Sequence, residues 1–145
     1  MKKAFLLIMM CFTTLAMHSQ STSQYVDLGL PSGTLWKQAN ETIEYSYADA
    51  IRYFDGFLPT SGQFRELIDN CQWKWTGRGY KVIGKSGKSI FLSAEFKRGN
   101  INLGAFWSIT KDDNEHCYGL LCYPSRVKID RTSIEGNSRN VILCK

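Results

Sequence analysis

The spacing of apolar residues along the first half of the chain predicts two helices. Ser46 followed by Asp49 is typical of a helix start, and Gly56 marks where this first helix ends. Thr60 and Gln63 form a capping box at the start of the second helix. The second helix has apolar residues at the i, i+3, i+4 and i+7 positions, which predicts one buried face: Phe64, Leu67, Ile68 and Cys71.

After Cys71 the apolar residues alternate with polar ones, which is the period of β-strands. The first of these strands contains Trp73 and Trp75, and we expect the apolar face of the second helix to pack against them. Glycine- and proline-containing turns separate the later strands, so an antiparallel arrangement and an α+β fold class are expected. The other predicted strands cover residues 25–28, 34–36, 80–82, 90–92, 106–109, 117–123, 127–129 and 141–144.

The N-terminal segment has the pattern of a secretory signal peptide. Lys2 and Lys3 precede an apolar run over residues 4–12, and small residues follow up to Ser19. The apolar run is too short to cross a membrane. We therefore expect a signal peptide over residues 1–19, one domain over 20–145, and a secreted, periplasmic or cell-surface location. The alternative is a lipid anchor at Cys11, but the residues before it are larger than those that usually precede a lipidated cysteine.

The charge of the chain argues against a polyanionic partner. The 18 lysine and arginine residues exceed the 13 acidic residues by five, and loss of Lys2 and Lys3 with the leader lowers this excess further. The basic residues form no block, so neither nucleic acid nor an anionic membrane is expected as the main partner. With 43% hydrophobic and 13% aromatic residues, the chain has the composition of an ordered globular domain.

Export makes the cysteines of the mature domain candidates for disulfide bonds: Cys71, Cys117, Cys122 and Cys144. Cys117 and Cys122 lie five residues apart in one predicted strand, so they point to opposite faces and are poorly placed to pair with each other. Two full pairings remain open. The alternative is that all four are buried thiols that pack as small hydrophobic side chains.

No group of residues forms a recognisable catalytic or metal-binding motif. The glycine-rich run over residues 84–89 lacks the first glycine of a phosphate-binding loop and precedes a strand, so it predicts a hairpin turn. His116, the only histidine after the leader, points away from the neighbouring Cys117 if both lie in a strand. Zinc would need closely paired ligands, which the sequence lacks. We expect no enzymatic activity, no metal and no cofactor.

Two other groups of residues have alternative interpretations. Asp112, Asp113, Asn114 and Glu115 could bind calcium, but they lack the EF-hand pattern and are typical of a solvated loop. A polysaccharide hydrolase would need two facing carboxylates, for which Glu95 opposite Asp112 or Glu115 is the candidate pair. The four tryptophans could stack on sugars, although such side chains more often belong to the core: Trp36, Trp73, Trp75 and Trp107.

The segment YVDLGLPSGTLW over residues 25–36 is the most distinctive motif of the chain. Together with Asn40, Phe64 and the segments 58–60, 66–75, 79–82, 89–92 and 107–108, it resembles the Fibrobacter succinogenes major paralogous domain, a family abundant in secreted proteins of Bacteroidetes. The resemblance implies a C-type-lectin-like fold, with two helices packed on a small, twisted antiparallel sheet. The sequence has no triplet of the calcium-dependent sugar-binding lectins, so their calcium site is not carried over.

These observations predict a secreted or surface-exposed, non-enzymatic recognition module that binds a glycan or protein ligand outside the cytoplasm. The alternative is a structural or adaptor component of the bacterial cell envelope. In lectin-like folds, ligands bind to the long loops of the second half, and we expect two such loops to lie side by side. The candidate ligand-binding residues are Lys97, Arg98, Asn100 and Asn102 on one loop, and Lys111, Asp112, Asp113 and Asn114 on the other.

Overall fold

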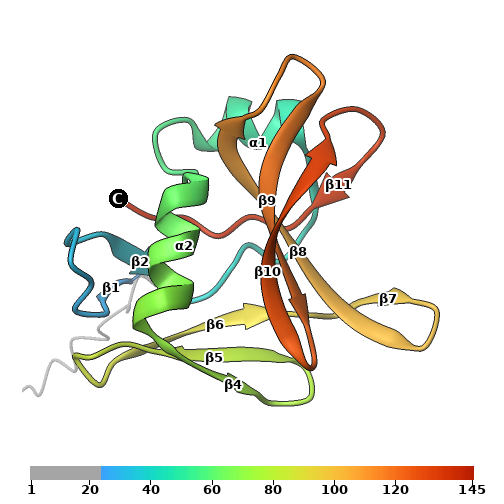
Figure 1. Cartoon of the computed structure of the whole chain (residues 1–145). Helices are drawn as coiled ribbons and strands as arrows, with labels where there is room; N and C mark the ends of the chain where they lie inside the picture. Colours follow the sequence, from blue (N-terminus) through green and yellow to red (C-terminus); the bar gives the residue numbers. More distant parts are fainter. Residues whose placement is uncertain (1–23) are drawn as a thin grey trace, which may run out of the picture.

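The computed structural model describes residues 24–145, in which 47% of the residues are in strands and 15% in helices. The predicted signal peptide over residues 1–19 and Cys11 lie outside the described residues. Figure 1 shows the strands divided among four small sheets. The elements are β1 (Tyr25–Asp27), β2 (Leu35–Lys37), β3 (Tyr45–Ser46), α1 (Tyr47–Phe54), α2 (Ser61–Asn70), β4 (Gln72–Trp75), β5 (Gly79–Ile83), β6 (Ser89–Ser93), β7 (Phe96–Arg98), β8 (Ile101–Lys111), β9 (His116–Tyr123), β10 (Arg126–Ser133) and β11 (Ser138–Arg139).

The expected α+β, C-type-lectin-like fold is wrong, because the protein is mostly β-structure, with two short helices and four small sheets. Its two helices have only eight and ten residues. They pack in separate hydrophobic clusters, α2 with Phe106 and Leu120, and α1 with Trp107 and Cys117. The strands form sheets of two, four, two and three members: β1-β2, β10-β9-β8-β7, β11-β3 and β4-β5-β6.

Both helix starts follow the capping pattern predicted from the sequence. The Ser46 side chain accepts a hydrogen bond from the backbone of Asp49, which fixes the start of α1. Thr60 and Gln63 exchange the two hydrogen bonds of a capping box at the start of α2. These bonds satisfy backbone N–H groups that have no partner within the helix.

The apolar face of α2 shares a hydrophobic cluster with the tryptophans of β4, as predicted, and α2 also packs on β8, β9 and β10. Phe64 and Leu67 are fully buried, and Trp73 and Trp75 pack against the same cluster. The Trp73 indole also donates a hydrogen bond to the carbonyl oxygen of Leu67 at 3.2 Å. The other two tryptophans, Trp36 and Trp107, are fully buried, so the prediction that the tryptophans belong to the core is confirmed.

The four-stranded sheet separates the two hydrophobic clusters. Phe106 and Trp107 are neighbours on β8, so their side chains point to opposite faces, and each belongs to a different cluster. On β9, Cys122 belongs to the cluster under α2 and Cys117 to the cluster under α1. This confirms that the two cysteines point to opposite faces of one strand.

The C-terminal segment is extended and buried without being a regular strand of its own, contrary to the prediction for residues 141–144. It runs beside β2, where the Lys37 amide donates to the carbonyl oxygen of Leu143 at 2.8 Å. Val141 and Leu143 cover the sheet together with α1, and Ile142 points into the other cluster. Within residues 24–145, no helix is both long and apolar enough to cross a membrane.

Candidate functional site

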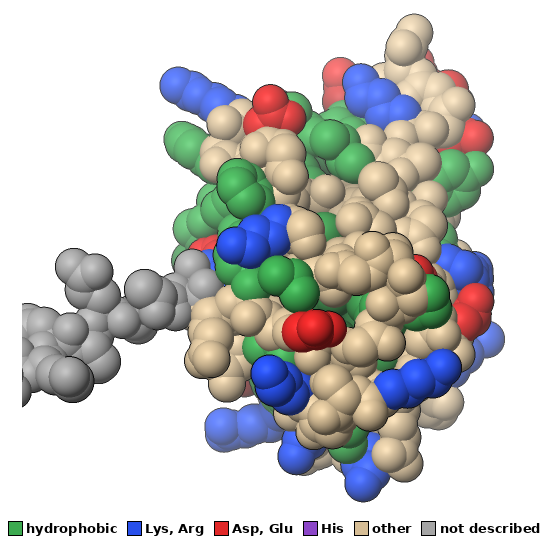
Figure 2. Space-filling model, turned by 90° about the vertical axis from the view of Figure 1, so that its left-hand side faces the viewer, with side chains coloured by type: hydrophobic (Ala, Val, Ile, Leu, Met, Phe, Trp, Pro, Cys, Tyr) green, Lys and Arg blue, Asp and Glu red, His purple; other side chains and the backbone are tan. Residues whose placement is uncertain are grey.

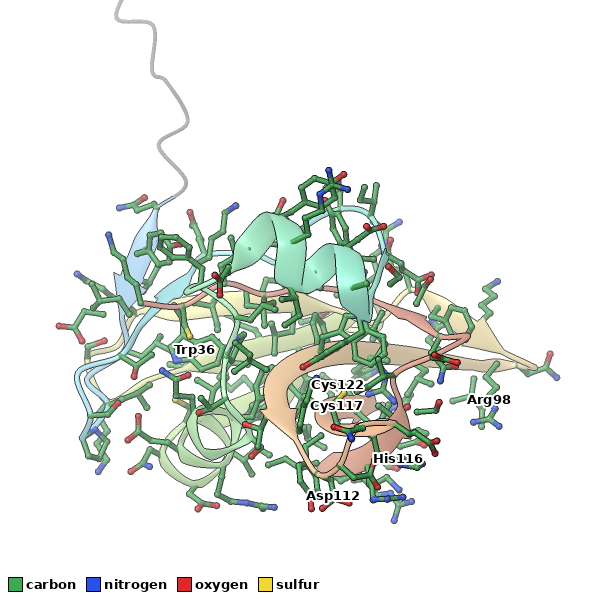
Figure 3. The ribbon with its side chains drawn as sticks, turned by 90° about the horizontal axis from the view of Figure 1, so that it is seen from above. Trp36, Arg98, Asp112, His116, Cys117 and Cys122 are labelled. Atoms are coloured by element: carbon green, nitrogen blue, oxygen red, sulfur yellow. The ribbon has the colours of Figure 1, made fainter. Side chains whose placement is uncertain are left out.

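The two loops proposed to form one site do not lie side by side, so this prediction is wrong. Lys97 and Arg98 belong to β7, and Asp112 follows the far end of β8. β8 has eleven residues, which corresponds to a length of about 33 Å. Because β7-β8 and β8-β9 are consecutive hairpins that share β8, their turns lie at opposite ends of it. Figure 3 shows Arg98 well away from Asp112 and His116.

The acidic side chains of the second loop are engaged within the protein. Arg131 donates to Asp112 at 2.5 Å and to Asp113 at 2.8 Å. Tyr118 donates to Asp112 at 3.0 Å, and a His116 ring nitrogen lies 2.9 Å from Asp113. The hydrogen bond that Arg131 donates lowers the pKa of Asp112, and the hydrogen bond from His116 lowers the pKa of Asp113. Lys111 and Asn114, beside this network, are exposed.

The carboxylate pair considered for a hydrolase is not assembled. Glu95 directly precedes β7, and Phe96 pairs with Leu103 near the start of β8. Asp112 and Glu115 lie beyond the other end of β8. The separation is about 25 Å along the sheet, far more than the spacing of about 5 to 10 Å that glycoside hydrolysis requires.

The first loop lies beside the main hollow of the surface, a groove of about 610 Å³ between the β7-β8 hairpin and β11. Lys97 and Arg98 line this groove. Asn102 pairs with Lys97 across the hairpin, and Asn100 is exposed in the turn. We call the groove between the β7-β8 hairpin and β11 the β7-β11 groove. It is lined by Glu44, Phe96, Lys97, Arg98, Gly99, Leu103, Ala105, Leu121, Tyr123, Asp130, Thr132, Asn137, Ser138 and Arg139.

The β7-β11 groove exists because only part of one sheet face is covered. Near Trp107 and Cys117, α1 and the C-terminal segment close over the sheet. Toward the other end of β8 this cover stops. Leu103 and Leu121, which line the groove there, are 6% and 9% exposed but belong to neither hydrophobic cluster. The groove therefore has an apolar floor on the central strands and polar walls.

Arg139 forms a buried ion pair with Asp130 in this groove. Its two terminal nitrogens donate to the two carboxylate oxygens of Asp130 at 2.9 and 2.7 Å, and the side chain of Arg139 is only 9% exposed. The guanidinium also lies over the Trp107 ring, 5.3 Å from its centroid. Gly119 leaves the necessary space, because a Cβ there would collide with Arg139 and lie 2.6 Å from the carbonyl oxygen of Phe106.

Aromatic and basic side chains form the rim of the β7-β11 groove. Phe96 is 49% exposed although it is a large hydrophobic residue. Tyr123 carries two cations against its ring, with Arg126 at 5.5 Å and Lys128 at 5.9 Å from the centroid. Lys97 and Arg98 line the groove on the side of β7, and Glu44 is an acidic residue in the same lining.

Sequence reasoning found Lys97 and Arg98 but missed the ion pair between Asp130 and Arg139. One signal for it was present. Gly119 interrupts an apolar strand, and a glycine inside a strand often marks a place where another group approaches the backbone closely. A second signal is the alternation along β10, where the polar Asp130 and Thr132 line the groove while Val127 and Ile129 point to the other face.

Comparisons with known proteins provide no identification. No protein-family model matches the chain. No curated protein and no solved structure matches it either. The resemblance to the Fibrobacter succinogenes major paralogous domain therefore stays a prediction, and function has to be argued from the geometry of the groove.

The four cysteines of the described residues are free thiols, so neither of the two disulfide pairings is formed. Burial raises the pKa of Cys117 and of Cys144 to about 11, and it also raises the pKa of Cys71 and Cys122. If the four cysteines formed two disulfide bonds, Cys117 would have to bond to a cysteine on the other face of the sheet. Cys71, Cys122 and Cys144 all lie on that other side. The cysteines therefore act as small hydrophobic side chains that pack in the interior, which was the alternative to disulfide bonds.

Proposed function

We propose that this chain is an exported, non-enzymatic recognition module that binds its ligand in the β7-β11 groove. The observation that carries the proposal is the β7-β11 groove, where the almost buried Leu103 and Leu121 form the apolar floor between polar and charged walls. A concave site of this composition, with a volume of about 610 Å³, has the size and chemistry of small-ligand sites in proteins.

The rigidity of the groove supports a binding role. Its floor belongs to β8 and β9, the two central strands of the sheet. Two parallel hydrogen bonds hold Arg139 on Asp130, so the guanidinium does not have to be ordered when a ligand arrives. A site that is already ordered loses less conformational entropy on binding, which favours affinity.

Two further features support the rest of the proposal. The buried thiols have raised pKa values and are poor nucleophiles at neutral pH, which favours binding over cysteine-based catalysis. The export part rests on the leader pattern of residues 1–19 and on the resemblance of residues 25–36 to a family of secreted proteins.

The proposal can be tested by capture of native partners with a groove-filling variant. The immobilised protein is exposed to envelope extract and culture medium of the native bacterium, and retained glycans and proteins are identified. Ala105→Trp fills the groove, because Ala105 lies on its floor. The matched control is Ala48→Trp on the exposed surface of α1, in a separate hollow beside Ile109. Both variants must keep the wild-type melting temperature within a few degrees.

We expect Ala105→Trp to lose a ligand that the wild type and Ala48→Trp both retain. The opposite pattern, with loss only in Ala48→Trp, would contradict the groove as the ligand site. It would instead favour the adaptor alternative, in which an envelope protein docks beside α1.

A further inference from the structure

The β7-β11 groove is flanked by cations that have no acidic partner. Within residues 24–145, ion pairs involve Lys37, Arg131, Arg139 and His116, but none involves the four basic residues around this groove: Lys97, Arg98, Arg126 and Lys128. Lys97 and Arg98 lie on β7, and the other two lie at the start of β10, on the opposite edge of the same sheet. Lys97 and Arg98 line the groove itself, whereas Arg126 and Lys128 lie against Tyr123, which is one of its lining residues.

Lysine and arginine side chains are spread over the surface, including the side that carries β1 and β2, which Figure 2 shows. Near the groove, Arg126 and Lys128 both lie against the same aromatic ring, that of Tyr123. Like charges held close together cost free energy, which an anionic ligand would recover.

The walls of the groove also contain groups that suit hydroxyl groups. Glu44 is a hydrogen-bond acceptor on the wall near Phe96, and it forms no ion pair among the described residues. Its carboxylate would repel a uniformly anionic chain but accepts hydrogen bonds from hydroxyl groups. Thr132, Asn137 and Ser138 add side chains that both donate and accept. An exposed aromatic ring, Phe96, completes the lining with an apolar surface.

We infer that the β7-β11 groove takes an acidic saccharide, whose carboxylate or sulfate groups face the unpaired cations and whose hydroxyl groups face Glu44, Thr132 and Asn137. This inference rests on the proposed function and adds the chemical class of the ligand. An acidic peptide fits less well because it offers Glu44 only its backbone N–H groups, whereas each sugar ring of a saccharide offers several hydroxyl groups.

The test measures binding of paired charged and neutral probes by calorimetry at low salt. Tetragalacturonate is compared with its methyl ester, and a carrageenan tetrasaccharide, which has sulfate but no carboxylate groups, with its desulfated form; this separates carboxylate from sulfate recognition. Hexaglutamate serves as the acidic peptide. The charge-reversal variant is Lys97→Glu with Arg98→Glu. The control is Lys85→Glu with Lys88→Glu, which changes the net charge equally at the distant, exposed turn between β5 and β6.

We expect at least one acidic saccharide to bind about tenfold more tightly than its neutral form, and to weaken as salt is added. Lys97→Glu with Arg98→Glu should lower this affinity about tenfold or more, and the control should leave it within about twofold. Tighter binding of hexaglutamate than of both acidic saccharides would overturn the inference in favour of an acidic peptide.

Equal binding of charged and neutral saccharides would overturn the acidic class, and so would failure of all the saccharides to bind. Neither result would remove the groove as a ligand site, because the capture experiment with Ala105→Trp tests the groove with native ligands. If Ala105→Trp still retains every native ligand, the proposed function fails independently of these probes.

Discussion

Arg139 and Asp130 form a bidentate ion pair, with N–O distances of 2.9 and 2.7 Å, in the β7-β11 groove. The pair joins β11 to β10, which are otherwise not hydrogen-bonded to each other in a sheet. It therefore connects two walls of the groove, one formed by β10 and the other by β11. Because the side chains are only 9% and 16% exposed, the pair is shielded from water.

Asp130→Ala should lower the free energy of unfolding by about 3 kcal/mol, because it leaves the Arg139 guanidinium buried without a partner. Urea denaturation measures the change. Replacing both residues, with Asp130→Leu and Arg139→Met, should restore part of the loss, since no buried charge is then left unpaired.

The control for this prediction is Arg131→Ala on the same strand. The ion pairs of Arg131 with Asp112 and Asp113 are exposed, and exposed pairs contribute about 0 to 1 kcal/mol. An equal loss in Asp130→Ala and Arg131→Ala would show that burial does not distinguish the two ion pairs.

Gly119→Ala should destabilise the protein and displace Arg139. The added Cβ would lie 2.6 Å from the carbonyl oxygen of Phe106 and would collide with the guanidinium, so the strand or the side chain has to move. Overpacking of this kind costs about 1 to 3 kcal/mol. Thermal unfolding and the ring signals of Trp107, which lies under Arg139, report the two effects.

Gly62→Ala is the comparison for the same substitution without a collision. Gly62 lies in α2, and its added Cβ would meet only the Thr60 hydroxyl, at an ordinary contact distance of 3.7 Å. This variant should be stabilised by about 0.4 to 1 kcal/mol. If Gly119→Ala were as stable as Gly62→Ala, Arg139 would not approach β9 as closely as described.

The thiols should make stability depend on pH in the alkaline range and not on reductant. Burial raises the pKa of Cys117 and Cys144 to about 11, so the folded state holds these protons more tightly than the unfolded state does. Their contribution to stability is complete below the ordinary thiol pKa of about 8.5 and is lost as the pH rises toward 11. Denaturation curves across this range measure the loss.

A reductant should leave the melting temperature unchanged, because the four thiols are free. Thiol-specific reagents should label the folded protein slowly at neutral pH and all four cysteines quickly in denaturant. A melting temperature that drops on reduction would show that a disulfide stabilises the protein.

Removal of divalent metal ions by EDTA should leave the melting temperature unchanged. The carboxylate oxygens of Asp112 and Asp113 already accept hydrogen bonds from Arg131, Tyr118 and His116. Calcium would have to replace these partners with about six to eight oxygen ligands. A clear fall in melting temperature, restored by added calcium, would contradict this expectation.

Local elements were predictable from the sequence, because their signals lie within a few residues of each other. The capping pairs of Ser46 with Asp49 and of Thr60 with Gln63 fixed both helix starts, and the spacing of Phe64 and Leu67 gave the buried face of α2. The separation of Cys117 and Cys122 onto two faces followed from strand geometry alone.

The assembly of these elements was not predictable in the same way. The lectin-like expectation depended on a resemblance, and local patterns do not decide how strands group into sheets. The sequence predicts a loop where β7 and β8 form a hairpin, because Lys97, Arg98 and Asn102 make both faces of this hairpin polar and leave no apolar alternation. Once β8 is recognised as one long strand, its two turns are necessarily far apart.

Only part of the candidate site was predictable, because local sequence patterns do not show which distant residues come together. Lys97 and Arg98 were recognised as polar residues without a structural role, and they line the groove. Asp130 and Arg139 lie nine residues apart on different elements, and only the tertiary fold brings them together.

Ligand binding in the β7-β11 groove can be mapped by NMR, with a captured native ligand titrated into the ¹⁵N-labelled protein. Amide signals of Phe96–Arg98 and Ser138–Arg139 should shift during the titration, and those of the β5-β6 turn over residues 84–88 should stay unchanged. Shifts confined to α1 or to the turn over residues 112–115 would contradict binding in the groove.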